Sequence, residues 1–425
     1  MKNYLEMTRE ELESERSSVS AEYEKLKGLG LKLDMSRGKP SKDQLDLSMD
    51  MLDVLKSDSS LIDETGLDCR NYGGLDGIRE AKELMAGIMN VSADNVIVCG
   101  NASLNIMYDT ISRSMTHGVC GSTPWCKLDK VKFLCPVPGY DRHFAITQNF
   151  GIEMINIPMT EAGPDMDMVE KLVSEDSSVK GIWCVPKFSN PQGYVYSDET
   201  VKRLAALKPA ASDFRIYWDN AYAVHELYDE VKLLDIFAEC EKNGNSDMVF
   251  EFASTSKISF AGGGISAVAS SKNNLDFIKK TMTVQTIGYD KVNELRHVRY
   301  FKNIDGIKSK MKEHAKLLAP KFEAVLKVFD EELKPLGIAE YTRPLGGYFI
   351  SFETMEGCAK DVVAKCKDAG VVLTKAGAPF PYGIDPKDTN IRIAPSFPSP
   401  AEMEQAAKVF VVAVKLSSLE KLLSR

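Results

Sequence analysis

The sequence contains no apolar run close to the roughly 20 residues that a helix needs to cross a bilayer. Its first segment, Met1 to Glu15, is too acidic and polar for a secretory signal peptide. Nine cysteines are present, but none stands in a CxxC pair or in the His-flanked spacing of a zinc site. We therefore expect a cytoplasmic protein with reduced thiols, no membrane segment and no metal site.

The sequence also has fewer basic than acidic residues. Lys and Arg number 53 against 61 Asp and Glu, which gives a formal net charge of −8. A field of this sign repels polyanions, so we expect no nucleic-acid partner and no binding to anionic lipid. A few local cations can still hold a small anionic substrate.

The chain has ample material for a large core. Its 425 residues exceed one ordinary domain, and 44% apolar with 27% charged residues is an ordinary globular balance. Short β-rich runs alternate with helical patterns, which predicts an α/β fold whose mostly parallel sheet carries helices on both faces. The predicted strands are Asn95 to Cys99, Val131 to Leu134, Gly181 to Val185, Arg215 to Trp218 and Val249 to Ala253. The predicted helices include Leu104 to Met115, Met166 to Ser174 and Ser197 to Leu207.

After Gly306 the pattern changes to a long helix, Ile307 to Leu333, and then short strands. A capping box at Thr8 and Glu11 begins a charged helical pattern that runs to about Leu29. We expect a large cofactor-binding domain over residues 50–306, and a smaller α+β domain formed by residues 1–49 together with 307–425. The C-terminal elements expected are strands near Ile338 to Tyr341, Tyr348 to Phe352 and Asn390 to Ala394, and a helix from Pro400.

Polar groups follow four of the predicted strands, at the edge of the sheet where ligands of open α/β folds bind. They are Gly100 to Ser103, Pro186 to Gly193, Asp219 to Tyr222 and Ser254 to Lys257. Each alone is a weak signal, because caps and turns use the same residue types. Their order and spacing are more specific: Tyr222 is three residues after Asp219, and Lys257 is 38 residues after it.

This set resembles the fold-type-I pyridoxal-phosphate aminotransferases, in which N-P-x-G, D-x-x-Y and S-x-S-K follow one another in this order. The resemblance extends from about Ser36 to Pro398. It implies pyridoxal 5′-phosphate as cofactor, a large domain with a mostly parallel seven-stranded sheet and a smaller α+β domain. Four segments look closest to the bacterial class Ic (MocR-like) aspartate aminotransferases: Tyr72 to Arg79, Pro136 to Phe144, Asp219 to His225 and Asp290 to Arg299.

The resemblance implies a role for each residue at the cofactor ring. Lys257 forms the Schiff base, and its freed amine moves the proton between Cα and C4′. Asp219 pairs with the pyridine nitrogen and keeps it protonated, because neighbouring opposite charges favour the charged form of both groups. Tyr222 and Asn190 form hydrogen bonds to the 3′ oxygen, and Tyr140 stacks on the ring.

The phosphate is expected at the helix start after Cys99, where free N–H groups and the helix dipole favour an anion. Many relatives place an arginine eight residues after the lysine, but Ile265 stands there in this chain, so another cation must serve. By the resemblance, Tyr72 reaches the phosphate of a neighbouring subunit, which implies a homodimer with active sites at the interface. The other expected phosphate contacts are Ala102, Ser103, Ser254 and Ser256.

Arg392 matches the family's arginine that binds the substrate α-carboxylate through its planar fork. Gly38, within a segment that resembles the family's lid over the substrate, and Asn190 are the further substrate contacts implied. A dicarboxylate also needs a second cation, for which the candidates are Lys291 from the other subunit, Arg296 and Arg37. If none of these points inward, an aromatic or aliphatic substrate is favoured.

We therefore predict amino-group transfer between L-aspartate or L-glutamate and a 2-oxo acid by a ping-pong cycle. One alternative is an aminotransferase, β-lyase or decarboxylase of the same fold acting on another amino acid, since fold does not fix reaction. A second is a non-catalytic, cofactor-binding sensor module of a transcription regulator. The roughly 35 residues before Ser36 are too few for a helix-turn-helix domain, which argues against the sensor.

Overall fold

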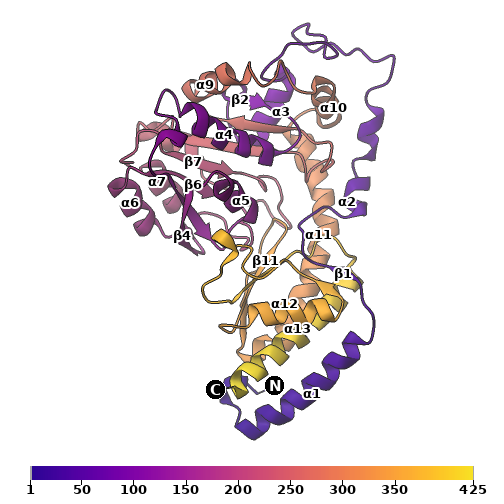
Figure 1. Cartoon of the computed structure of the whole chain (residues 1–425). Helices are drawn as coiled ribbons and strands as arrows, with labels where there is room; N and C mark the ends of the chain where they lie inside the picture. The colour runs from indigo at the N-terminus through magenta and orange to yellow at the C-terminus, as the bar shows by residue number, and fades with distance from the viewer. Residues whose placement is uncertain (1, 425) are drawn as a thin grey trace.

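An eight-stranded sheet, formed by β2 to β9, lies at the centre of the upper body of the molecule, and helices cover both of its faces (Figure 1). The computed structural model describes residues 2–424. The strand order is β2-β9-β8-β7-β6-β3-β4-β5. The strands from β8 to β4 in this order are parallel, whereas β9 is antiparallel to both neighbours and β5 is antiparallel to β4. The bounds are β2 (Val96–Val98), β3 (Lys132–Val137), β4 (Glu153–Thr160), β5 (Gly163–Pro164), β6 (Val179–Cys184), β7 (Arg215–Asp219), β8 (Val249–Ser254) and β9 (Ser266–Ala269).

The predicted fold class is confirmed, and all five β-rich runs named from the sequence form strands. The remaining strands β4, β5 and β9 were not recognisable as such runs. β9 consists of the small-residue sequence Ser-Ala-Val-Ala, and β4 mixes exposed with buried positions, so neither presents a continuous apolar stretch. The two-residue β5 adds an eighth strand to the seven expected.

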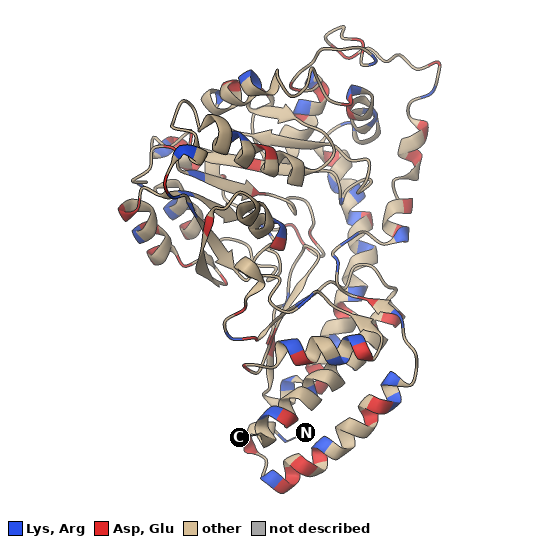
Figure 2. Ribbon diagram, viewed as in Figure 1, with Lys and Arg blue, Asp and Glu red and all other residues tan. Residues whose placement is uncertain are grey.

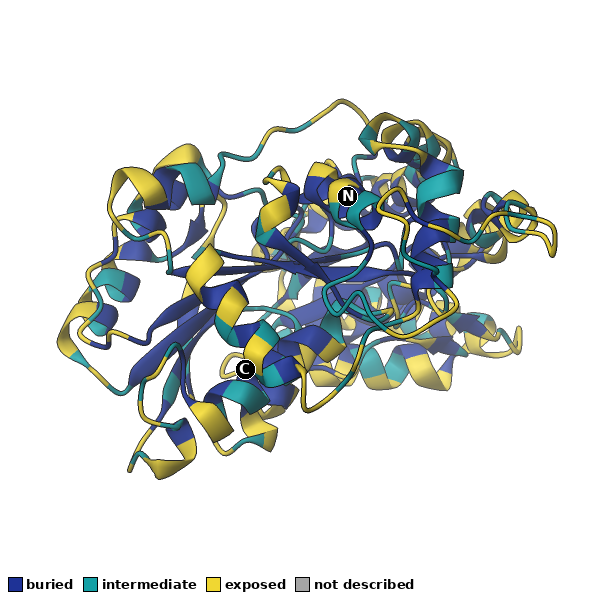
Figure 3. Ribbon diagram, turned by 90° about the horizontal axis from the view of Figure 1, so that it is seen from above, coloured by how far each residue is buried: buried dark blue, intermediate teal, exposed yellow. Residues whose placement is uncertain are grey.

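The sheet is buried because both of its faces are covered, as Figure 3 shows for the strands seen from above. Strands β6, β7 and β9 are buried at every residue. Successive side chains point to opposite faces, so Tyr217 joins one core cluster and its neighbour Trp218 joins the other. Because packed side chains cover both faces of the sheet, a ligand can reach it only at the ends of its strands.

Within residues 2–424, nine helices belong to the upper body and to the segment that leads into it. The three helices predicted from periodicity in this region are confirmed as α4, α6 and α7. No helix among residues 2–424 is both long enough and apolar enough to cross a membrane. The bounds are α2 (Lys42–Asp46), α3 (Arg79–Met89), α4 (Ser103–His117), α5 (Asp141–Asn149), α6 (Met166–Glu175), α7 (Asp198–Ala205), α8 (Ile236–Lys242), α9 (Lys272–Met282) and α10 (Lys291–Phe301). Short 3-10 turns are η1 (Tyr4–Glu6), η2 (Met49–Asp53), η3 (Ala93–Asn95), η4 (Trp125–Lys127), η5 (Lys334–Leu336) and η6 (Pro381–Gly383).

The long helix α11 (Ile304–Glu332) runs from the upper body into the lower one (Figure 1). There an antiparallel sheet of order β10-β11-β13 packs against the C-terminal helices. Three aromatic rings join these layers, since Phe352 lies 5.3 Å from Phe329 and 4.7 Å from Phe410 between centroids. The bounds are β10 (Ala339–Tyr341), β11 (Ile350–Thr354), β13 (Asn390–Ile393), α12 (Ala359–Asp368) and α13 (Pro400–Leu423).

The N-terminal segment joins this lower body. The capping box of Thr8 and Glu11 is confirmed at the start of α1 (Arg9–Lys27), which lies along α13 and is charged over much of its length (Figure 2). Strand β1 (Leu33–Asp34) then pairs in parallel with β12 (Val371–Val372). This arrangement suits the small domain expected from the sequence, but the proposed boundaries at residues 50 and 306 stay a prediction.

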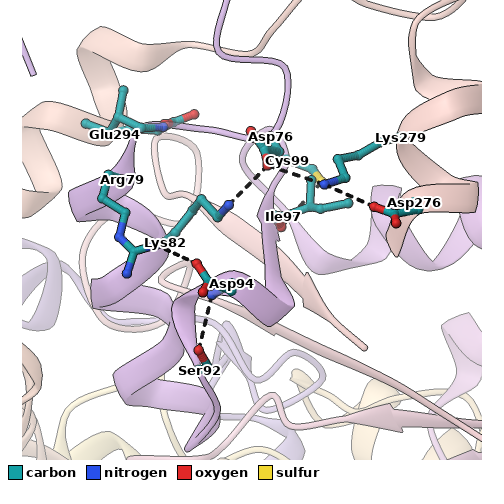
Figure 4. Close-up of polar contacts among 11 residues, drawn as sticks. Asp76, Arg79, Lys82, Ser92, Asp94, Ile97, Cys99, Asp276, Lys279 and Glu294 are labelled. Atoms are coloured by element: carbon teal, nitrogen blue, oxygen red, sulfur yellow. Dashed lines mark hydrogen bonds and ion pairs between the residues drawn. The ribbon is translucent and has the colours of Figure 1, made fainter. Parts of the chain in front are cut away.

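Ion pairs stabilise the position of helix α3 beside the edge of the large sheet (Figure 4). Asp76 accepts from Lys82 at 3.0 Å and lies 3.9 Å from Lys279 of α9. Arg79 pairs with Asp94, which precedes β2, at 2.6 Å. These contacts link α3 to α9 and β2, and so fix the edge of the sheet from which α4 departs.

Candidate active site

A cavity of about 500 Å³ opens where the carboxyl ends of β6 and β7, the turn after β8, and strand β13 come together. The N-terminal segment Ser36 to Lys39 forms another of its walls. Nine residues predicted from the sequence line this one cavity, although they are spread over most of the chain. They are Arg37, Gly38, Ser103, Tyr140, Asn190, Asp219, Tyr222, Lys257 and Arg392.

Lys257 lies in the turn that follows β8, and its side chain enters the cavity beside two tyrosine rings. Its Nζ is 4.9 Å from the ring centroid of Tyr222 and 5.9 Å from that of Tyr348. Burial among these rings lowers the pKa of the Lys257 amine below its ordinary value, and the charge of Asp219 partly offsets this by raising it. The lysine is therefore easier to deprotonate than a lysine in water.

Asp219 ends β7 with its carboxylate buried in the same cavity. Its Oδ2 lies 2.9 Å from Nε2 of His143, which in turn stacks on Trp183 with centroids 4.4 Å apart. Its Oδ1 is buried and has no hydrogen-bond partner anywhere in residues 2–424. One oxygen is thus fixed from behind, while the other is free to accept a hydrogen bond from a cationic group in the cavity.

A buried polar cluster backs the lysine. Burial raises the pKa of Tyr222 well above its ordinary value, and burial followed by the charge of Lys257 lowers the pKa of His225 well below its own. Both residues are therefore neutral at physiological pH. Gln44 of α2 donates to Tyr348 Oη at 3.0 Å and lies 3.1 Å from Nδ1 of His314. The cluster therefore ties the N-terminal segment to the wall behind the lysine.

The end of the cavity expected to bind phosphate is formed by the start of α4. Ala102 is the N-cap residue and makes no side-chain capping bond, and Ser103 follows it at the cavity wall. Ser254 donates to Ser256 at 3.1 Å, and Ser256 donates to the carbonyl of Asn101 at 3.3 Å, so both hydroxyls lie beside this helix start. Unpaired backbone N–H groups at a helix N-terminus attract anions.

Arg392 extends from β13 into the cavity and is held on several sides. Its Nη1 lies 2.6 Å from Asp141 and 3.4 Å from Oδ1 of Asn190. The guanidinium stands 4.9 Å from the ring centroid of Phe349. Its Nε is buried without a partner in the described part of the chain, so the fork keeps a donor for an added carboxylate.

Some predicted residues lie away from the cavity lining. Tyr72 is 79% exposed on this chain, and Lys291 is buried with its aliphatic stem against Gly74. Ile265 is buried in an apolar cluster, so its position offers no charge for a phosphate. Arg37 does line the cavity, unlike the other candidate for the distal carboxylate on this chain, Arg296.

Sequence reasoning missed several residues that complete the site. Asp141 and His143 stand in the segment Pro136 to Phe144, which was used for the resemblance, but only the folded helix α5 shows what they contact. Three further cations line the cavity, and sequence reasoning assigned no role to them. They are Lys39, Arg142 and Lys375.

Comparisons with known proteins find relatives over nearly the whole chain. The family model for aspartate amino-transferases matches residues 7–425. An aspartate aminotransferase of Corynebacterium glutamicum is 45% identical over 405 residues, which covers 95% of this chain and 93% of that protein. The crystal structure of an aspartate transaminase from the same species has a TM-score of 0.96 to this chain at 43% identity, with 99% of each chain covered. A Thermus thermophilus α-aminoadipate aminotransferase, solved with a phosphopyridoxyl-leucine, shares the fold at 17% identity and a TM-score of 0.74.

Fold and site together define a fold-type-I, pyridoxal-phosphate-dependent aminotransferase. The match over nearly the whole length goes further: the chain belongs to the aspartate amino-transferase family. The predicted aminotransferase activity is thereby confirmed at the level of the enzyme class.

Proposed function

We propose that this enzyme moves an amino group between L-aspartate or L-glutamate and a 2-oxo acid by a ping-pong cycle, with pyridoxal phosphate held on Lys257. The observation that carries the proposal is that Lys257, Asp219 and Arg392 line one cavity. Their functional groups are the amine, carboxylate and guanidinium that this chemistry needs. We also propose a place in the class Ic (MocR-like) subgroup, which the four sequence segments support.

The residues of the cavity fit this cofactor. The unpaired, buried Oδ1 of Asp219 suits a protonated ring nitrogen, because a carboxylate stabilises that proton. The uncapped start of α4, with Ala102, Ser103, Ser254 and Ser256 around it, suits a phosphate. When bound, pyridoxal phosphate supplies an aldehyde that takes up the substrate amino group and a ring that withdraws electrons from the reacting carbon.

The chain's own residues then carry the proton and orient the reactants. The Nζ of Lys257, with its lowered pKa, takes the proton from the substrate Cα and returns it. Tyr222 and Asn190 would hold the 3′ oxygen of the cofactor, and Tyr140, which stands edge-on to His143 at 4.9 Å, would pack against its ring. The fork of Arg392 binds the α-carboxylate, and Gly38, which lines the same cavity, contributes its backbone.

A dicarboxylate substrate is supported by the charge of the cavity wall. Besides Arg392 and Lys257, four cations line it against two carboxylates, so an anionic side chain gains favourable electrostatics there. Among the candidates named from the sequence, Arg37 is the one on this chain that reaches the wall. The cations are Arg37, Lys39, Arg142 and Lys375, and the carboxylates are Asp141 and Asp219.

We further propose a cytoplasmic homodimer whose interface completes each active site. Tyr72 is 79% exposed and lies outside the lining of its own chain's cavity, so a contact with phosphate would be made to a second copy. In the same proposal Lys291 serves the partner's substrate. Complementation tests the arrangement: Lys257→Ala and Tyr72→Ala subunits, each impaired alone, should regain activity when mixed, because hybrids contain one intact site. No recovery in verified hybrids would count against shared sites.

The substrate is tested by spectral half-reactions of the purified holoenzyme with single amino acids. L-Aspartate and L-glutamate should convert the bound cofactor to its amine form faster than L-alanine or L-phenylalanine, without release of pyruvate or ammonia. Faster conversion by phenylalanine would overturn the dicarboxylate proposal, and released ammonia would point to β-elimination. Bound cofactor that reacts with no amino acid would favour the sensor.

A further inference from the structure

A second and larger cavity, of about 910 Å³, lies beside the active site but shares no lining residue with it. Its walls are the end of α3, the first half of α11 and the segment 223–237 that leads into α8. Two consecutive residues at the end of β7 line different cavities. Asp219 lines the active-site cavity, and Asn220 lines the second cavity. The second cavity therefore borders the same strand end as the proposed cofactor site.

The floor of this second cavity carries Glu251, a carboxyl group that is only 2% exposed. One of its oxygens accepts a hydrogen bond from Asn220 Nδ2 at 2.7 Å, and no ion pair to Glu251 occurs among residues 2–424. Burial, with a smaller contribution from the charge of Asp235, raises the pKa of Glu251 to about 8. A buried carboxyl without a cation is costly to ionise, and a cation placed beside it removes that cost.

Two of the four lysines that line this cavity already have other partners. Lys187, the buried cation of this wall, lies 2.5 Å from Glu226 and donates to the carbonyl of Ala223 at 2.7 Å. Lys308 pairs with Glu230 at 2.9 Å. Six carboxylates line the cavity against four lysines, so its field favours a positive ligand. The carboxylates are Glu226, Asp229, Glu230, Asp235, Glu251 and Asp305, and the lysines are Lys187, Lys232, Lys308 and Lys312.

We propose that this cavity binds a small organic ammonium ion, with the carboxylate of Glu251 as its counter-ion. The ligand is organic because apolar side chains also line the cavity, among them Met89, Val224, Ile236 and Met311. A metal ion fits less well, since residues 2–424 contain no cluster of three or more His, Cys, Asp or Glu side chains that could coordinate it. An occupant would contact Glu251, which accepts a hydrogen bond from Asn220, the residue next to Asp219.

The test uses N,N-dimethylethanolammonium, a tertiary ammonium ion that cannot condense with the aldehyde of the cofactor. Its neutral isostere is 3-methyl-1-butanol. Calorimetric titration of the holoenzyme near pH 8 should show the cation bound at least tenfold more tightly than the alcohol. Glu251→Gln keeps the acceptor for Asn220 but removes the charge, and should bring this ratio to about one. Equal binding of both probes to the wild type, or an unchanged ratio in Glu251→Gln, would overturn the proposal.

A matched control is Glu294→Gln, which removes another buried carboxyl whose pKa is raised by burial, to about 7. Glu294 does not line this cavity, so the preference for the cation should persist. Ala315→Leu, on α11, narrows the cavity while leaving Glu251 in place, and should weaken binding of the cation. Should Glu251→Gln fail to fold, equal binding of the two probes to the wild type overturns the proposal by itself. Both readouts are binding constants, so they do not depend on which amino acid the enzyme converts.

Discussion

The Nε2 atom of His143 lies 2.9 Å from Oδ2 of Asp219, and both side chains are buried. This contact satisfies one carboxylate oxygen and leaves Oδ1 without a hydrogen-bond partner among residues 2–424. The stacking of His143 on Trp183, with planes only 9° apart, fixes the imidazole in turn. These contacts fix the Asp219 carboxylate in place, and in the proposed function it would pair with the protonated ring nitrogen of the cofactor.

His143→Phe should lower kcat roughly 10- to 100-fold, because a buried oxygen left without its partner costs about 1–3 kcal/mol. If His143 acts through Asp219, the pH dependence of the cofactor's visible absorption must move as well. Steady-state rates and absorption titrations of the holoenzyme check both effects. The control is His117→Ala, which removes an exposed histidine. If His143→Phe is slower but the pH dependence of the cofactor's absorption does not change, the role of His143 is merely structural.

Arg392→Lys should raise the KM for amino acids and lower kcat/KM about 100-fold or more, while cofactor binding changes little. A lysine keeps the charge but cannot reproduce the two-pronged contact with a carboxylate. Kinetics with L-aspartate and a cofactor-binding titration separate the two effects. Arg203→Lys, at a surface ion pair, provides the control. A matching loss of cofactor affinity would identify Arg392 as a structural residue instead.

The Lys257 amine should titrate below 10.5, its ordinary pKa, because burial disfavours the ammonium form. Only the neutral amine is nucleophilic, so its reaction with trinitrobenzenesulfonate in the apoenzyme should rise with pH around a midpoint below that value. Asp219 favours the ammonium form, so Asp219→Asn should move the midpoint further down. Peptide mass spectrometry gives the rate at residue 257. A midpoint at or above 10.5, or an upward move in Asp219→Asn, contradicts this electrostatic account.

Gly38→Ala should raise the KM for amino acids several-fold, because an added Cβ would overlap the ring of Phe349. That ring also packs on Arg392, so the strain reaches the carboxylate-binding group. Overpacking of this kind costs about 1–3 kcal/mol. Gly28→Ala, where a Cβ meets only ordinary contacts, is the matched control. Unchanged kinetics in Gly38→Ala would show that the N-terminal segment does not close over the substrate.

The sheet and the residues at its strand ends were predictable because two short-range signals coincide there. Apolar runs mark β6, β7 and β8, and polar motifs follow them at fixed spacing. The sequence alone therefore placed Asp219 and Lys257 just after two of the predicted strands. Strand β9 was missed because its small side chains carry little apolar signal.

Contacts between distant segments could not be predicted in this way. The pair of Asp141 and Arg392 spans 251 positions, and neither residue's neighbours specify the other. Glu251 looks in the sequence like a polar interruption of an apolar strand, and only the packing of α3 and α11 reveals the cavity above it. Lys291 likewise lies away from the cavity lining of its own chain, so the role proposed for it is in the active site of the partner subunit.

The central claim, that Lys257 carries the cofactor, is tested most directly by borohydride reduction of the holoenzyme followed by peptide mapping. Reduction fixes the cofactor to whichever amine holds it. We predict a single phosphopyridoxyl group, on the peptide that contains Lys257, and none in Lys257→Ala. A label on a different lysine, or the same label in that variant, would contradict the account.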